Sequence, residues 1–389
     1  MPNPMNDEVL AAARAGDAVA LAQVMVATPS VNPVLAEGGA GESEMADLTA
    51  GWLRHWGFET VIVTAAPGRL NVVGSLAGDG PTLLLNGHLD TVGVDGMSIP
   101  PFSGEIVDGR LLGRGSCDMK GGVAAILAAA SRLASTGRRP NLIVALTADE
   151  EHASLGMAHL VGSGVKADLA IVCEPTSLAV MPAHKGFVWI AADFQGRAAH
   201  GSRPEIGIDA IRHAGLYLAA LDSYASSLRA RPAHPLLQYG SLHAGTITGG
   251  SAESVYPESC SLLLERRTMP GEDPTQIVRE FQSVLDALLE REPALSATLE
   301  MTLERPGTDV PESSPLVRGL VEAAVVHGLQ GKIEGMTAWV DAAFLNQAGI
   351  PAVCFGPGDI AQAHTKDEWI DVGEIRACAD VLETFARAL

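Results

Sequence analysis

The chain has 389 residues, of which 47% are hydrophobic and 19% charged, so it holds enough apolar material to bury a large core. This composition excludes wholesale disorder and fibrous repeats, and the length predicts two or three domains. Aromatic residues are only 4% and the formal net charge is −20, which argues against nucleic-acid and anionic-membrane binding. The acidic excess is either solvated surface or, in part, carboxylates gathered around cations.

The cysteines and the N-terminal stretch indicate a compartment. The five cysteines are odd in number and form no C-x-x-C pair, so we expect buried thiols and neither a disulfide scaffold nor a zinc ribbon. The first residues carry two acids before any base and lack a long apolar core, unlike a signal peptide. The most apolar stretches are too short to span a bilayer. We therefore expect a soluble cytoplasmic protein.

The first half of the chain alternates helical and strand patterns. The runs at 141–147 and 168–173 are continuously apolar, as are strands buried on both faces of a mainly parallel sheet. This alternation predicts an α/β layered domain. In chain order, we predict helices at 7–28 and 43–56, strands at 58–64, 71–76 and 81–86, a helix at 121–136, and strands at 141–147 and 168–173.

The pattern changes near residue 183. Residues 186–196 alternate apolar and polar side chains, as a half-exposed antiparallel strand does. The order of elements then predicts a β-α-β-β-α-β, ferredoxin-like sandwich. We expect an α/β domain of residues 1–182 and 305–389, interrupted by an inserted α+β domain of residues 183–304. The later elements are a helix at 207–222, strands at 241–250 and 260–267, a helix at 273–291, a strand at 296–304, a helix at 315–328 and a strand at 351–358.

Acidic and histidine side chains stand where the predicted apolar strands end. Ligands of open α/β sheets collect beyond the carboxyl ends of the strands, so these side chains form a candidate site. Each of them alone is more often an ordinary loop residue or a helix-start acid, and only their joint placement favours a site. They are His88 and Asp90, then Asp149, Glu150 and Glu151, then Glu174 and His364, with Asp118 between a Gly-rich turn and a helix start.

The chemistry of this set favours metal binding. Clustered carboxylates repel one another, and without a cation some would have to stay protonated. Asp118, Glu151 and Glu174, together with two imidazoles, form a mixed oxygen and nitrogen set that suits zinc, with cobalt or manganese as alternatives. The H-x-D spacing predicts that Asp90 hydrogen-bonds the second ring nitrogen of His88 and fixes its tautomer.

Six motifs, in order, resemble the co-catalytic zinc amidohydrolase and metallopeptidase family of acetylornithine deacetylase, succinyl-diaminopimelate desuccinylase, aminoacylase and glutamate carboxypeptidase. The resemblance runs from about residue 10 to the C-terminus. It implies a zinc-binding domain interrupted by a lid or dimerisation domain. The motifs are HLDTV (88–92), GRGSCDMKGG (113–122), TADEE (147–151), CEPT (173–176), AAHGSRPEIGIDAI (198–211) and GPGDIAQAHTKDEW (356–369).

The resemblance also implies roles for the site residues. It implies two metal ions per subunit and hydrolysis of the amide of an N-acyl amino acid, in the manner of acetylornithine deacetylase. A metal-activated hydroxide would attack the amide, with Glu150 as the general base that later protonates the leaving amine. The ligands implied are His88, Asp118 and Glu174 for one ion, and Asp118, Glu151 and His364 for the other.

Further residues are implied around the substrate. His200 matches a histidine that reaches a neighbouring subunit's active site and stabilises the oxyanion, which implies a homodimer through the inserted domain. Arg267 matches an arginine that grips the substrate carboxylate. Its neighbour Arg266 is expected to face the other side of the strand as a plain surface residue. The backbone groups of Gly356 and Gly358 are expected to line the same pocket.

Three positions depart from the family pattern. Ser254 stands where Asn is usual, and its shorter side chain puts that substrate contact in doubt. His152 follows the glutamate pair where Gly is usual, and we interpret it as a bystander. Cys117 stands where a small residue is usual, and we interpret it as a packing residue.

Other functions fit the sequence less well. Residues 356–361 fit G-x-G-x-x-A, but no long helix and distant acid follow them, so a dinucleotide site is rejected. The chain has no G-x-S-x-G serine-hydrolase motif. A dipeptidase or carboxypeptidase of the same family stays open. A non-catalytic metal-binding homologue is disfavoured because all ligand positions and Glu150 are filled.

Overall fold

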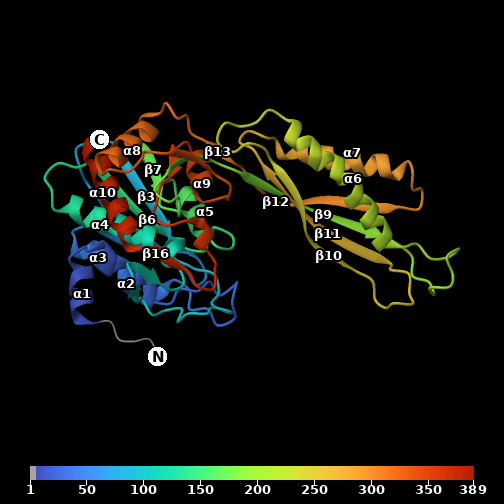
Figure 1. The fold of residues 1–389 in the computed structure, drawn as a ribbon, viewed down its shortest axis with the longest axis horizontal. Coiled ribbons are helices and arrows are strands. Elements are labelled where there is room, and N and C mark those ends of the chain that lie inside the picture. The colour runs from blue at the N-terminus through green and yellow to red at the C-terminus, as the bar shows by residue number, and fades with distance from the viewer. Residues whose placement is uncertain (1–5) are drawn as a thin grey trace. The chain divides into compact units, whose positions relative to one another are not determined.

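The computed structural model describes residues 6–389 and divides the chain into two compact units. The larger unit comprises the described residues up to 182 together with 310–334 and 340–389, and the smaller unit comprises 183–309 and 335–339. Both units combine sheets with helices (Figure 1). The α/β fold class predicted from the sequence is confirmed.

The larger unit is built on a mixed sheet in the order β1-β2-β6-β3-β7-β15-β8. Strands β6, β3, β7 and β15 run parallel, whereas β1, β2 and β8 pair antiparallel with their neighbours. The strands are β1 (Glu59–Ala66), β2 (Arg69–Leu76), β3 (Thr82–His88), β6 (Asn141–Thr147), β7 (Leu169–Val172), β8 (Val180–His184) and β15 (Ala352–Cys354).

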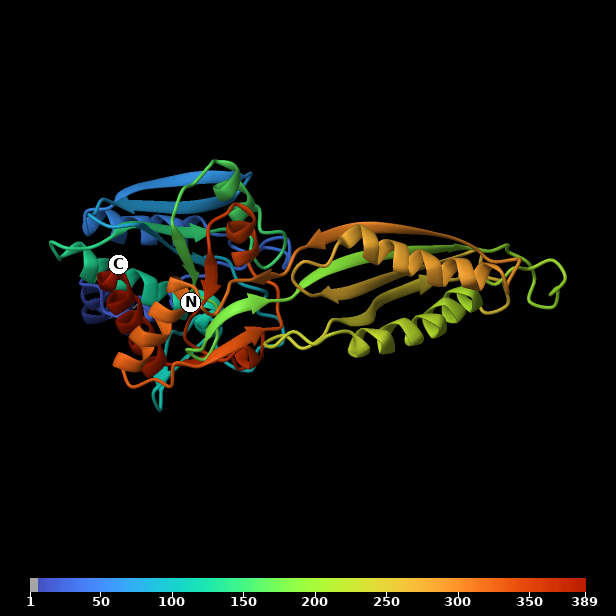
Figure 2. The same ribbon diagram turned by 90° about the horizontal axis from the view of Figure 1, so that it is seen from above.

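The parallel strands are apolar because both faces of the sheet are covered. Leu83, Leu84 and Leu85 are consecutive in β3 and all fully buried, which a strand exposed on one face would not allow. The connections β3-to-β6 and β6-to-β7 run in opposite directions across the sheet. Right-handed crossovers therefore place α4 (Gly121–Ala134) and α5 (Leu155–Gly162) on opposite faces (Figure 2).

Helix α4 packs closely because its residues are small. It contacts β3 and β6 on one side and α2 and α10 on the other. A Cβ atom on Gly122 would collide with the backbone carbonyl of Cys173, immediately after β7. The remaining helices of this unit are α1 (Asp7–Arg14), α2 (Ala18–Ala27), α3 (Ser43–His55), α8 (Pro315–Val326), α9 (Ala342–Gln347) and α10 (Val372–Ala388).

The prediction of one helix over 7–28 is wrong, because α1 and α2 are separate. Gly16 has a φ of +89°, a left-handed conformation that ends α1. The Asp17 side chain then accepts hydrogen bonds from the backbone N–H groups of Val19 and Ala20 at 3.0 and 2.8 Å, which starts a new helix. In the sequence, the break was marked by the Gly16-Asp17 pair inside an otherwise helical pattern.

The smaller unit has the predicted β-α-β-β-α-β order, and its antiparallel sheet has the strand order β10-β11-β9-β12. Alternate residues of β9, from Val188 to Phe194, are buried against the two helices. Its elements are β9 (Gly186–Gln195), α6 (Ala210–Ala230), β10 (Ser241–Gly249), β11 (Ser259–Thr268), α7 (Pro274–Leu289) and β12 (Ser296–Arg305).

The expectation that Arg266 is a surface residue is wrong. Strand alternation does separate it from Arg267, but the face that it joins is the one covered by helices, and Arg266 is 1% exposed. Its guanidinium donates to Glu272 at 2.6 Å and to the hydroxyl of Tyr224 at 3.2 Å. This pairing stabilises a buried charge that would otherwise be costly.

Short elements complete the fold. They are β4 (Ile106–Val107), β5 (Arg110–Leu112), the π-helical turn η1 (Ser116–Lys120), β13 (Thr308–Asp309), β14 (Ile333–Met336), the 3-10 turn η2 (Ile360–Gln362) and β16 (Trp369–Asp371). Strands β16, β5 and β4 form a small sheet of their own.

The cysteines are all buried and free, as predicted. The thiol of Cys117 donates to the carbonyl of Asp359 at 3.3 Å, which agrees with a packing role. Over residues 6–389, no helix combines the length and apolar character needed to cross a membrane.

The contact of Gly122 with Cys173 gives a stability prediction. We expect Gly122→Ala to lower the free energy of unfolding of the metal-free protein by about 1–3 kcal/mol, because the backbone carbonyl that it meets cannot rotate away. Gly51→Ala in α3 is the control, since nothing lies within 4 Å of its Cβ position. That change should stabilise the same unit by about 0.5–1 kcal/mol. Urea titrations measure both, and equal effects would contradict the close-packing interpretation.

Candidate metal centre

The acidic and histidine side chains predicted from strand ends do converge on one edge of the sheet. His88 is the last residue of β3, Glu150 and Glu151 follow β6, and Glu174 follows β7. Because β3 lies between β6 and β7, the three segments are neighbours. The chain also changes direction across the sheet here, which is where open α/β sheets bind ligands.

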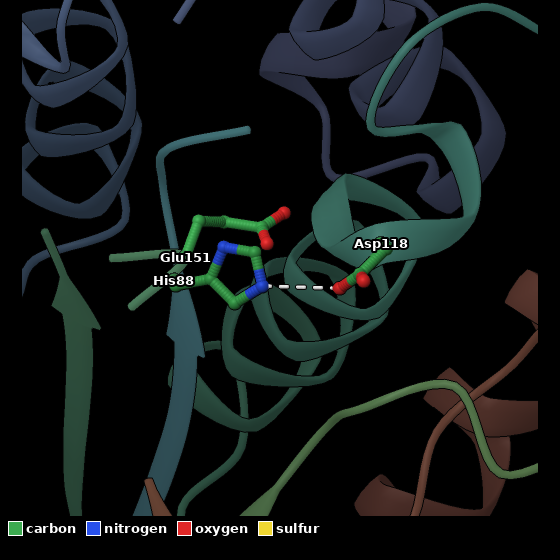
Figure 3. A group of neighbouring side chains, drawn as sticks. All are labelled: His88, Asp118 and Glu151. Carbon is green, nitrogen blue, oxygen red and sulfur yellow. Dashed lines mark hydrogen bonds and ion pairs between the residues drawn. The ribbon is translucent and has the colours of Figure 1, made fainter. Parts of the chain in front are cut away.

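Asp118 lies between two imidazoles. Its Oδ1 is 3.1 Å from His88 Nε2, and its Oδ2 is 3.3 Å from His364 Nε2. His364 Nε2 is also 3.0 Å from Glu151 Oε2. Figure 3 shows His88 and Asp118 directed toward each other, with Glu151 beside the ring. One ligand atom from each of these three residues lies within 4.8 Å of the other two, as a metal ion requires.

Some carboxylate oxygens of this site lack the partners that buried acids normally have. One oxygen of Glu151 and one of Glu174 are buried without a hydrogen bond. Burial and the charge of Asp118 raise the pKa of Glu174 to about 8. The pKa of Glu150 is also raised, by burial and then by Glu174. Unpaired oxygens and crowded negative charge are what a bound divalent cation would neutralise.

The imidazoles counter this repulsion at Asp118. Burial alone would raise the pKa of Asp118, but hydrogen bonds from His364 and His88 hold it well below its usual range. In turn, Asp118 and Glu151 raise the pKa of His364 to about 10. Two imidazoles and three carboxylates therefore form an oxygen and nitrogen set that suits divalent metal ions.

Asp90 acts differently from the prediction. Its carboxylate does not hydrogen-bond His88: Nδ1 of the ring faces the backbone carbonyl of Asp90 at 2.9 Å, whereas the nearer carboxylate oxygen is 3.8 Å away. The carboxylate instead accepts the backbone N–H groups of Glu150 at 3.1 Å and Glu151 at 3.3 Å. Asp90 thus orients the ring through its main chain and the two glutamates through its side chain.

A buried polar network behind Asp90 was missed from the sequence. Asn32 donates to Asp90 at 2.8 Å and to Asp149 at 3.0 Å. Arg69 donates to Asp149 at 2.7 Å and to Glu42 at 2.6 Å. Its members come from distant segments, and no local spacing connects them. The network reaches Asp90 through Asn32, which helps to fix the Oδ2 atom that also accepts the N–H of Glu151.

Asp341 is a further acid near the site that the sequence did not reveal. It is 1% exposed, its Oδ1 has no partner, and Thr147 donates to its Oδ2 at 3.4 Å. Burial raises its pKa to about 7. Its charge also raises the pKa of both Glu150 and Glu174. Asp341 does not follow a predicted strand, so nothing in the sequence indicated that it lies near the site.

The predicted substrate contacts of Gly356 and Gly358 are not supported, because their backbone groups are already paired. Gly356 exchanges hydrogen bonds with Thr176 through both its N–H and its carbonyl. Gly358 donates to Glu374 at 2.6 Å and accepts from Ser177 at 2.7 Å. A Cβ on Gly356 would collide with the backbone of Cys173 and Glu174. The structure gives both glycines a packing role, which holds Glu174 in place.

In the smaller unit, His200 and Ser254 lie on adjacent segments. An isolated bridge pairs His200 with Val255, and Gly201 donates to the carbonyl of Ser254 at 2.6 Å. Both His200 and Ser254 are exposed, and the His200 ring contacts only its neighbour Ser202, at 2.9 Å, among the hydrogen bonds found for the described residues. The exposed ring is available to a group outside this unit.

Arg267 keeps part of its guanidinium free. Its Nε donates to Glu265 at 2.7 Å and the guanidinium lies 5.4 Å from the ring centre of Phe187, but its buried Nη1 has no partner. An unpaired guanidinium N–H is a donor for an anionic group. His152, in the larger unit, is exposed, which agrees with its interpretation as a bystander.

The model of peptidase family M20/M25/M40 matches residues 84–388. An acetylornithine deacetylase of Pectobacterium carotovorum is 32% identical over 94% of this chain and 95% of its own length. An acetylornithine deacetylase of Myxococcus xanthus is 32% identical over 81% of this chain and 82% of its own length.

Solved structures show the same fold. A tripeptidase from Staphylococcus aureus, 20% identical, has a TM-score of 0.78 over 96% of this chain and 98% of its own. A dinuclear metal-binding peptidase of the M20 family from Bacillus subtilis, 16% identical, has a TM-score of 0.73 over 97% of this chain and 98% of its own. The chain therefore belongs to peptidase family M20/M25/M40 and is a metal-dependent enzyme that hydrolyses amide bonds.

Proposed function

We propose that this enzyme removes the acyl group from an N-acyl amino acid, using two divalent metal ions, with zinc preferred over cobalt or manganese. The observation that carries the proposal is Asp118, whose two oxygens face His88 and His364 on opposite sides. A carboxylate so placed can bridge two ions. The acetylornithine deacetylases that match most of the chain support an N-acyl amino acid as substrate.

In this proposal the ions are divided between two ligand sets that share Asp118. Ions bound there supply Lewis acidity, which lowers the pKa of water and polarises a carbonyl. The unpaired buried oxygens of Glu151 and Glu174 support their assignment as ligands. The sets are His88, Asp118 and Glu174 for one ion, and Asp118, Glu151 and His364 for the other.

Glu150 is the proposed general base. Its carboxyl is buried and faces other acids, which raises its pKa well above the usual range. A carboxyl group in such a place can take up and deliver a proton. It takes a proton from the attacking water and gives it to the leaving amine nitrogen. Asp90 keeps this side chain in position by accepting the backbone N–H groups of residues 150 and 151.

The smaller unit contributes the proposed substrate and dimer contacts. The unpaired N–H of Arg267 suits the carboxylate of an amino-acid substrate, and Ser254 lies beside His200 to contact the same ligand. We propose that residues 183–304 act as the lid and dimerisation domain, and that exposed His200 stabilises the oxyanion in the partner subunit. The free, buried thiols support a reducing, cytoplasmic location.

The substrate proposal is tested by kinetics on the metal-free protein reconstituted with zinc, cobalt or manganese. We expect no turnover without metal and the highest kcat/KM on N-acetyl amino acids. N-succinyl amino acids and dipeptides should be poorer substrates. A higher kcat/KM on dipeptides would contradict the proposed deacylase activity and indicate a peptidase. The proposed metal centre would be unaffected by that result.

The role of Glu150 is tested by Glu150→Gln. We expect full metal content with kcat lowered about 10²- to 10⁴-fold, because the amide cannot accept the proton. His152→Ala is the control, since this side chain is two residues away and exposed. Metal analysis and steady-state kinetics measure both. A Glu150→Gln variant with near wild-type kcat would contradict the assignment of Glu150 as general base.

The role of His200 across subunits is tested by mixing two inactive variants, Glu150→Gln and His200→Ala. If His200 serves the partner's site, each mixed dimer contains one complete site, and activity returns on mixing under conditions that allow subunit exchange. If His200 serves its own subunit, no site is complete and activity stays absent. A monomeric wild-type enzyme with full activity would also contradict the proposal.

A further inference from the structure

We propose that Glu368, assisted by Arg114, is a positioning residue that holds Asp118 and His364 at the spacing required by the second metal ion. The inference rests on the proposed metal centre. Glu368 is fully buried and lies four residues after His364. It has no place among the ligands, and its carboxylate is directed at the segment that carries Asp118.

The carboxylate of Glu368 is hydrogen-bonded through both oxygens. Oε1 accepts the backbone N–H groups of Cys117 at 2.9 Å and of Asp118 at 3.1 Å. Oε2 accepts the backbone N–H of Gly115 at 3.0 Å and Nη1 of Arg114 at 2.6 Å. One buried side chain therefore accepts three backbone N–H groups from residues 115–118, the segment that carries Asp118.

These bonds join two segments that are far apart in the sequence. The backbone carbonyl of Glu368 also accepts the N–H of Gly113 at 3.0 Å, and β16, which starts at the next residue, pairs with β5. His364 and Asp118 are thus fixed relative to each other through Glu368. His88 and Glu174, by contrast, are held by the ends of β3 and β7.

Because Glu368 holds the ligands of one ion more than those of the other, Glu368→Gln should affect the binding of the two ions unequally. Glutamine at position 368 would keep one acceptor oxygen and turn an NH₂ group toward two of the four donors. Those donors would lose their partner inside the protein, so the segment around Asp118 would shift. The ion held by Asp118, Glu151 and His364 should suffer more than the ion held by His88, Asp118 and Glu174.

The experiment is a zinc titration of the metal-free protein, with a chromophoric chelator as competitor. We expect wild type to bind two ions and Glu368→Gln to bind one of them about 10- to 100-fold less tightly, with the other affected less. Excess zinc should restore turnover of the variant.

Glu272→Gln is the matched control. Glu272 likewise accepts two arginines, Arg266 at 2.6 Å and Arg231 at 3.1 Å, and a backbone N–H, that of Met269 at 2.7 Å, but it belongs to the smaller unit. The Glu272→Gln substitution should destabilise the smaller unit and leave both zinc affinities unchanged. A loss of zinc affinity in this control equal to that of Glu368→Gln would overturn the positioning role.

A second variant covers the case in which Glu368→Gln does not fold. Arg114→Met removes one of the two donors to Oε2, together with the hydrogen bond from Arg114 Nε to the carbonyl of Gly93. Because the three backbone donors to Glu368 remain, it should weaken the second ion by a smaller factor. Unchanged zinc affinity in every variant that folds would overturn the inference, while the wild-type protein would still bind two ions. A wild-type protein that binds fewer than two ions would instead overturn the proposed metal centre, and this inference with it.

Discussion

Mutual repulsion of buried carboxylates is the constraint on which the site depends. Asp118, Glu150, Glu151 and Glu174 come together at one edge of the sheet, and the pKa of each glutamate is raised there. Apolar folding alone would not hold these acids so close. Only protonation, the facing imidazoles or bound cations offset the repulsion. Cations bound at such a site could activate water, which agrees with the amide hydrolysis that the family match shows.

Two other buried acids, Asp90 and Glu368, hold the segments that carry these carboxylates. Both do so by accepting backbone N–H groups. Asp90 accepts the N–H groups of residues 150 and 151, and Glu368 accepts those of residues 115, 117 and 118. Backbone donors are fixed in direction and cannot rotate away as side chains do. Acids used in this way position the ligands without competing for the same cations.

The elements were predictable where periodicity was strong. The strand at 141–147 has the predicted limits, and the helix at 43–56 differs by one residue. The surface prediction for Arg266 failed because packing decided the outcome: the residue lies on the strand face that the helices cover, where Tyr224 and Glu272 accept its hydrogen bonds. The pairing of the Gly356 and Gly358 backbone groups with Thr176, Ser177 and Glu374 was likewise not indicated by any local spacing. The acidic net charge was a poor guide to the metal site, since the few proposed carboxylate ligands are a small part of the 46 acidic residues.

Periodicity and motif order are local properties, so they were enough to predict the α/β class, the family and the acids and histidines at strand ends. The packing of distant segments, in contrast, places Asp118 between two imidazoles and lets Asp90 accept the backbone N–H groups of the glutamates. It also brings Asp341 and Glu368 beside the site. These are contacts between segments as much as 250 residues apart. Their geometry is set by how strands and loops pack, which no local spacing encodes.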